Sequence, residues 1–214
     1  MIFNSIEFAI FLPIVFGIYW LLQGSIKRQN FFLLVASYFF YGWWDWRFLF
    51  LIALSSGVDF IVGQQIYQEK DGQKQKYWLW LSLAVNLGLL GFFKYYNFFL
   101  ENFVEAFTLL GSPFEAERLN IVLPVGISFY TFQTLSYTID IYKGRIKPTN
   151  DPLAFFSYVS FFPQLVAGPI ERSKKLLPQF TVKRVFNYNK AVDGMRQILW
   201  GMLKKVVIAD NCAP

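Results

Sequence analysis

Long apolar runs, separated by short polar and charged stretches, make up most of this chain. Seven such runs stand out, at 8–22, 31–44, 48–66, 77–93, 119–142, 153–170 and 191–208. A helix that crosses a bilayer needs about 20 residues, and most of these runs reach or approach that length. The pattern predicts an all-α, polytopic membrane helix bundle. The run at 31–44 is short and aromatic, so we expect it to be tilted, partly interfacial, or extended by its flanks.

The basic residues lie between the apolar runs and predict the topology. With the N-terminus outside, the stretches at 24–30, 68–76 and 143–150 fall inside and carry most of the loop Lys and Arg. The outside segments 45–47 and 94–118 hold three basic residues in all, and 94–118 also holds four Glu. Since cytoplasmic loops of membrane proteins are rich in Lys and Arg, the pattern favours an outside N-terminus.

The run at 153–170 departs from simple alternation. The stretch that follows, 171–190, is also rich in Lys and Arg and should lie inside, so this run should not cross the membrane. Pro163 and the Gly168–Pro169 pair would break a helix there. We therefore predict a re-entrant or broken helical pair. Apolar and basic residues alternate in 171–190, which is typical of a segment lying on an anionic leaflet.

Composition agrees with a membrane protein. Hydrophobic residues make up 55% and charged residues 16%, whereas a soluble globular chain has roughly a quarter charged. The net charge of +6 comes from loop residues, so we interpret it as a topology signal and expect no nucleic-acid partner. The chain starts with an acidic MIFNSIEF segment and has no cleavage site, so we expect the first run to be retained.

Several kinds of chemistry are excluded within this sequence. It has no histidine and one cysteine, Cys212. Ordinary transition-metal sites need such ligands, so we expect no metal. A general base or nucleophile made of histidine cannot come from these residues. Phosphate-binding loops and dinucleotide fingerprints are also absent from the sequence, so we expect no bound cofactor.

Two apolar segments, 123–144 and 161–172, carry polar residues that a plain anchor would not need. Gln133 and Asp140 are seven residues apart and should share one side of a helix. Gln133 either ties two helices together or lines a substrate tunnel. Asp140 either pairs with Lys143 or Arg145 at the interface or faces a pore.

The second segment places polar residues around its predicted break. Gln164, Glu171 and Arg172 flank Gly168 and Pro169. Helix ends at a break expose unpaired backbone groups that can hold a ligand. The alternative is a capped turn with a surface ion pair.

One further acid lies within a predicted span. Asp59 falls in the run at 48–66. An acid at that depth is either functional or paired with a base, for which Arg47 and Arg196 are the candidates.

Three segments are long enough to serve as specific sequence motifs: LPVGISFYTFQTLSYTIDIYKG at 123–144, FFPQLVAGPIER at 161–172 and GMLKKVVIAD at 201–210. They resemble the membrane-bound O-acyltransferase family, in particular the branch of the alginate O-acetylation proteins. The start of the chain and SYFFYGWWDWRF at 37–48 are similar to the same branch. The resemblance extends over residues 1–214, which we expect to be the N-terminal portion of one membrane domain in a longer protein.

The resemblance implies helices packed around a funnel and a multi-pass protein of the bacterial inner membrane. It implies transfer of an acyl group from a cytoplasmic thioester, acetyl-coenzyme A or an acyl carrier protein, towards a polysaccharide acceptor outside. An extracytoplasmic acetyltransferase partner often takes part. The catalytic histidine of the family lies in its second half, so no catalytic residue can be assigned here. The residues assigned to the funnel or substrate path are Gln133, Asp140, Gln164, Gly168, Pro169, Glu171 and Arg172.

Two other functions remain compatible with these residues. In a transporter or channel-like protein, Asp59, Gln133 and Asp140 would line a substrate path and the broken helix would form a site. The third possibility is a membrane scaffold without catalysis.

Overall fold

The computed structural model describes residues 3–109, 119–165 and 171–212, and these are helical or irregular without any strand. The N-terminal part consists of α1 (Ile6–Leu21), α2 (Ile26–Gly42), α3 (Phe48–Gln68), α4 (Gly72–Leu90), the π-helical turn η1 (Gly91–Tyr95) and α5 (Tyr96–Leu109). The C-terminal part consists of α6 (Ile127–Tyr142), α7 (Pro152–Val159), α8 (Phe162–Leu165), α9 (Ser173–Leu176), the 3₁₀ turn η2 (Leu177–Phe180), α10 (Tyr188–Leu203), η3 (Lys204–Ala209) and α11 (Asp210–Cys212).

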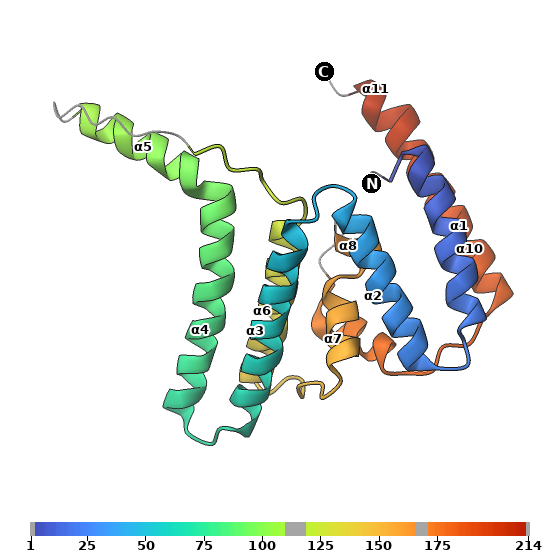
Figure 1. Cartoon of the computed structure of the whole chain (residues 1–214), viewed down its shortest axis with the longest axis horizontal. Helices are drawn as coiled ribbons and strands as arrows, with labels where there is room; N and C mark the ends of the chain where they lie inside the picture. The colour runs from blue at the N-terminus through green and yellow to red at the C-terminus, as the bar shows by residue number, and fades with distance from the viewer. Residues whose placement is uncertain (1–2, 110–118, 166–170, 213–214) are drawn as a thin grey trace.

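The first four helices run up and down in alternation (Figure 1). The junctions α1–α2, α3–α4 and α6–α7 lie at the lower end of that view, and they are the basic stretches predicted to share one side. The N-terminus and the α2–α3 and α4–α5 junctions lie at the upper end. The predicted alternation of the helices is thus confirmed, while their orientation relative to a membrane stays a prediction.

Three helices, α3, α4 and α6, pack against one another and hold the centre of the structure. Their apolar core continues through Tyr137 and Phe155, whose rings lie 4.6 Å apart, into α7. A second, smaller aromatic cluster joins α1, α2 and α8 around Phe40 and Phe162. Between helices in a bilayer, such contacts stabilise the fold through close van der Waals packing.

The predicted break in 153–170 is confirmed for its described part. Asp151 caps the start of α7, accepting hydrogen bonds from the main-chain N–H groups of Leu153 at 2.9 Å and Ala154 at 3.2 Å. A continuous helix is blocked because the Pro163 ring would meet the carbonyl of Val159, four residues earlier. α7 starts near the lower end, and α8 lies beside the upper parts of α2 and α6 (Figure 1). Residues 171–187 then lie nearer the lower end again.

Three boundaries differ from the prediction. The run at 119–142 is helical only from Ile127, because Pro124 and the left-handed Gly126, with φ of 76°, precede it. Part of the expected outside loop 94–118 is helix α5, which continues from α4 through a bend at η1 (Figure 1). The last apolar run, predicted from residue 191, is helical from Tyr188 in α10, and before it Leu176, Leu177 and Phe180 turn into the core.

Candidate functional site

The two motif segments of the sequence lie against each other in the structure. At the upper end of α6, Gly126 packs on the main chain of Leu165 so closely that a Cβ atom there would overlap the Leu165 carbonyl oxygen. Only glycine combines this left-handed backbone with such an approach at little cost. Residues 123–144 and 161–165 are therefore joined by a contact that depends on one glycine.

Gln133 connects α6 to the end of α7. Its side-chain amide donates a hydrogen bond of 2.8 Å to the main-chain carbonyl of Tyr158. The last carbonyls of a helix have no partner within it, so Gln133 satisfies one of them. Gln133 is therefore a helix tie, the first of its two predicted roles. A role in a substrate path stays a prediction.

Asp140 lies near the C-terminal end of α6, where a negative charge is unfavourable to the helix dipole. Its carboxylate pairs with Arg145 at 3.3 Å and accepts a hydrogen bond of 3.5 Å from the hydroxyl of Ser173. The predicted local pairing with Arg145 is confirmed. Ser173 starts α9, directly after Glu171 and Arg172, so Asp140 also fixes the chain that follows the break.

The remaining predicted site residues fall into two groups. Gln164 is partly buried in α8, Glu171 is partly buried and Arg172 is exposed. Gly168 and Pro169 lie outside the described residues. Gln133 contacts Tyr158 of α7 and Asp140 contacts Ser173 of α9, so the two residues share one side of α6, as their spacing predicts.

The most buried polar cluster joins α3, α4 and α6. The Asp59 carboxylate accepts hydrogen bonds from the Ser82 hydroxyl at 2.5 Å and from the Asn86 amide at 2.8 Å. The Asn86 side-chain oxygen accepts from Ser55 at 2.6 Å and from Thr134 at 3.2 Å. Every member is fully or almost fully buried. Buried polar groups are stable when they are paired in this way.

This cluster corrects the expected partners of Asp59. Arg47 pairs with Asp45 at 2.6 Å instead, and Arg196 is exposed on α10. Ser82 and Asn86 were not among the residues predicted from the sequence to form a site. Their four-residue spacing within the apolar run 77–93 could have indicated a polar stripe on one helix face.

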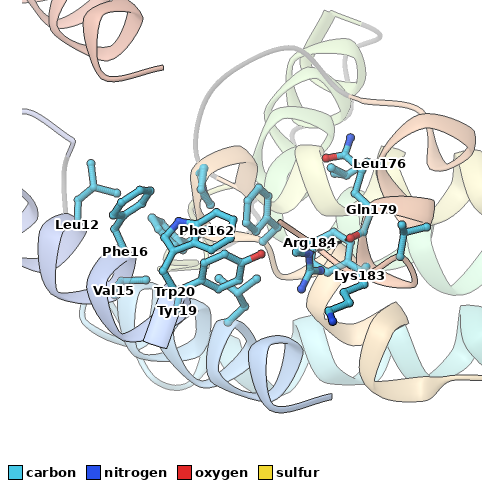
Figure 2. A pocket seen from close by; sticks show the side chains of 15 residues that line it. Leu12, Val15, Phe16, Tyr19, Trp20, Phe162, Leu176, Gln179, Lys183 and Arg184 are labelled. Carbon is cyan, nitrogen blue, oxygen red and sulfur yellow. Dashed lines mark hydrogen bonds between the residues drawn. The ribbon is translucent and has the colours of Figure 1, made fainter. Parts of the chain in front are cut away.

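An apolar cavity of about 510 Å³ opens between α1 and residues of 161–163 and 176–184. Figure 2 shows its lining, with Tyr19 and Trp20 of α1 on one side and Gln179, Lys183 and Arg184 on the other. Arg184 lies over the rings of Tyr19 and Phe180, at 5.7 and 5.3 Å. Partial burial lowers the pKa of the Arg184 guanidinium, but arginine stays charged at neutral pH.

These arrangements hold polar side chains in fixed positions. The sequence contains no histidine. Among the described residues, no group of three or more His, Cys, Asp or Glu side chains could hold a metal ion. The Asp140 carboxylate forms an ion pair with Arg145, and the Asp59 carboxylate accepts hydrogen bonds from Ser82 and Asn86.

The fold has the features of a helical membrane protein. Two helices in the described part, Phe48–Gln68 and the continuous Gly72–Leu109, are long and apolar enough to cross a bilayer. Many large apolar side chains point outward, among them Ile10 and Ile14 of α1, which are 58% and 54% exposed.

Comparison with known proteins gives a more specific result. Over its whole length the chain is 39% identical to the "Probable alginate O-acetylase AlgI" of Pseudomonas aeruginosa. It is 38% identical to the protein of that name in Azotobacter vinelandii. It is also 37% identical to the "Peptidoglycan O-acetyltransferase" of Helicobacter pylori. The resemblance to the membrane-bound O-acyltransferases that the sequence motifs indicated is confirmed along the entire chain.

The chain spans 41%, 42% and 45% of these three relatives, respectively. No family model matches the chain, and no solved structure matches it.

Proposed function

We propose that this chain is the N-terminal part of a membrane O-acyltransferase that modifies a polysaccharide outside the cytoplasm. The observation that carries the proposal is the similarity of the whole chain to polysaccharide and peptidoglycan O-acetyltransferases at 34–39% identity. The transporter and scaffold alternatives have no comparable support.

The proposed reaction transfers an acyl group from the sulfur of a thioester to the oxygen of an acceptor hydroxyl. The acceptor hydroxyl oxygen attacks the carbonyl carbon of a thioester, the carbon–sulfur bond breaks, and the thiol leaves with a proton. A general base that takes the hydroxyl proton typically contributes about 10²–10⁴-fold to such a step. The resemblance assigns this base to a histidine in the second half of the protein.

The described residues fit the task of positioning around that centre. The basic loops at one end of the bundle would attract a phosphorylated donor such as acetyl-coenzyme A or an acidic carrier protein. Gln133 and Asp140, with Glu171 and Arg172, would fix the broken helix beside the substrate path. The acetyl group would pass to the polysaccharide directly or through an extracytoplasmic partner.

The proposal is tested by deleting the complete gene in its own bacterium and measuring ester-linked acetyl groups on the secreted polysaccharide and on peptidoglycan. Loss of acetyl ester from one of them, restored by the complete gene, is the expected result. The unmodified strain must be shown to transcribe the gene under the same growth conditions. Normal acetylation of both polymers in the deletion strain would then contradict the proposal.

A further inference from the structure

The cavity that α1 forms with 161–163 and 176–184 has two distinct parts. One part is apolar and is formed by Leu12, Val15 and Phe16 of α1 together with Phe162 and Pro163 (Figure 2). The other part is basic and is formed by Lys183 and Arg184, which belong to the stretch predicted to lie at the cytoplasmic surface. The cavity is thus complementary to an amphiphile that has an apolar tail and a negatively charged head.

Two buried donors in this cavity lack a hydrogen-bond partner in the described part of the chain. They are Nη1 of Arg184 and Nε1 of Trp20. The other nitrogens of Arg184 are fixed by the protein. Nη2 donates to the Asn30 side chain at 2.8 Å, and Nε donates to the Gln179 carbonyl at 3.0 Å. A buried donor without a partner is costly, so Nη1 is placed for an acceptor that lies beyond the described residues.

The apolar part has the size and direction of a single hydrocarbon chain. Trp20 and Leu12 are eight residues apart on α1, which corresponds to about 12 Å along a helix axis. This path begins at the basic end and runs towards the middle of the structure. Ile10, Ile14 and Ile18, on the opposite face of the same helix, are exposed, so α1 lies at the edge of the described structure, where lipid would surround it.

From these observations we infer that the cavity binds one anionic phospholipid of the cytoplasmic leaflet. Its phosphate accepts a hydrogen bond from Nη1 of Arg184, and one acyl chain lies between α1 and α8. A charge-assisted hydrogen bond of this kind is stronger than a neutral one. A free phosphate would leave the apolar part unfilled, and the ammonium of a zwitterionic lipid would face Lys183. The inference requires membrane placement but not acyl transfer.

The test is native mass spectrometry of the intact full-length protein in detergent, titrated separately with phosphatidylglycerol and phosphatidylcholine of equal chain length. Phosphatidylglycerol should bind more tightly. Arg184→Gln should weaken its binding at least about tenfold, as expected for the loss of a charge-assisted bond. Lys190→Gln removes the same charge from the same stretch outside the cavity and should have little effect. Equal affinity for both lipids, or equal losses in the two variants, would overturn the inference.

A second variant tests the apolar part without changing charge. Leu12→Trp should fill it and weaken phosphatidylglycerol binding at least about tenfold. Ile14→Trp adds the same ring to the exposed side of α1 and should bind like the unmodified protein. Unchanged binding by Leu12→Trp would overturn the inference. So would displacement of the lipid by equimolar inorganic phosphate or acetyl-coenzyme A, which would identify a phosphate or donor site instead. Because the readout is lipid binding, a failure of the proposed acyl transfer would leave this result unchanged.

Discussion

Gln133 and Tyr158 are joined by two reciprocal hydrogen bonds. The Gln133 amide donates to the Tyr158 main-chain carbonyl at 2.8 Å, and the Tyr158 hydroxyl donates to the Gln133 main-chain carbonyl at 3.3 Å. Both residues are buried. The pair links the middle of α6 to the end of α7, so it holds the first motif segment against the helix that leads into the second one.

Replacing Gln133 by Leu should destabilise the protein. The change leaves the Tyr158 carbonyl buried without a partner, which costs about 1–3 kcal/mol. The measurement is the thermal unfolding midpoint of the detergent-solubilised full-length protein. Gln197→Leu, on the exposed surface of α10, is the matched control. Equal midpoints for the two variants would show that the tie contributes nothing to stability.

Asp59 should tolerate Asn far better than Leu. Asn keeps an oxygen that can accept from Ser82 or Asn86, whereas Leu leaves both donors buried and unpaired at about 1–3 kcal/mol each. We expect Asp59→Leu to lower the amount of folded protein in the membrane and Asp59→Asn to retain most of it. The measurement is fluorescence-detected size-exclusion chromatography. Asp59→Asn that folds normally but abolishes acetylation would instead assign a functional role to the charge.

Gly126→Ala should be much more harmful than Gly144→Ala. Both glycines have positive φ, 76° and 67°, so Ala costs roughly 1–2 kcal/mol of backbone strain at either site. Only at Gly126 does the added Cβ also overlap a carbonyl, that of Leu165, whereas the space around Gly144 is open. Thermal unfolding midpoints compare the two variants. Similar losses for both would mean that the contact between 123–144 and 161–165 gives way easily.

Single-cysteine labelling should reveal the predicted sidedness. In a background where Cys212 is replaced by Ser, Lys74→Cys should react with an impermeant maleimide only after the cells are permeabilised. Asn102→Cys, at the opposite end of the α4–η1–α5 helix, should react in intact cells. Labelling of Lys74→Cys from outside would reverse the orientation derived from the loop charges.

The 214 residues expressed alone should show no acyl transfer above background. They contain no histidine, and a surface carboxylate with a pKa near 4 is a weak base at neutral pH. The measurement is acetyl ester on the secreted polysaccharide in a strain that lacks the complete gene. Co-expression of the remaining part of the protein is the positive control, provided that the two parts assemble. Acetylation by the 214 residues alone would disprove the histidine mechanism for this protein.

The sequence by itself determined the class of fold and the positions of most helices. Apolar runs of nearly bilayer length and basic residues confined to the gaps between them are local properties of the chain, so they can be read without a structure. The break before Pro163 was predictable for the same reason, because a proline ring excludes the helix that would continue through it. The pairing of Asp140 with Arg145 also lies within five residues.

Only the tertiary structure decided which distant residues share a site. Asp59 and Asn86 are 27 residues apart, and Asn30 and Arg184 are 154 apart. Helix periodicity gives the face on which each side chain lies, but not the helix that packs against that face. For this reason Asp59 was assigned charged partners, whereas it has neutral ones from α4. The cavity beside Arg184 could not be predicted either, because it exists only where α1 meets the chain returning from the break.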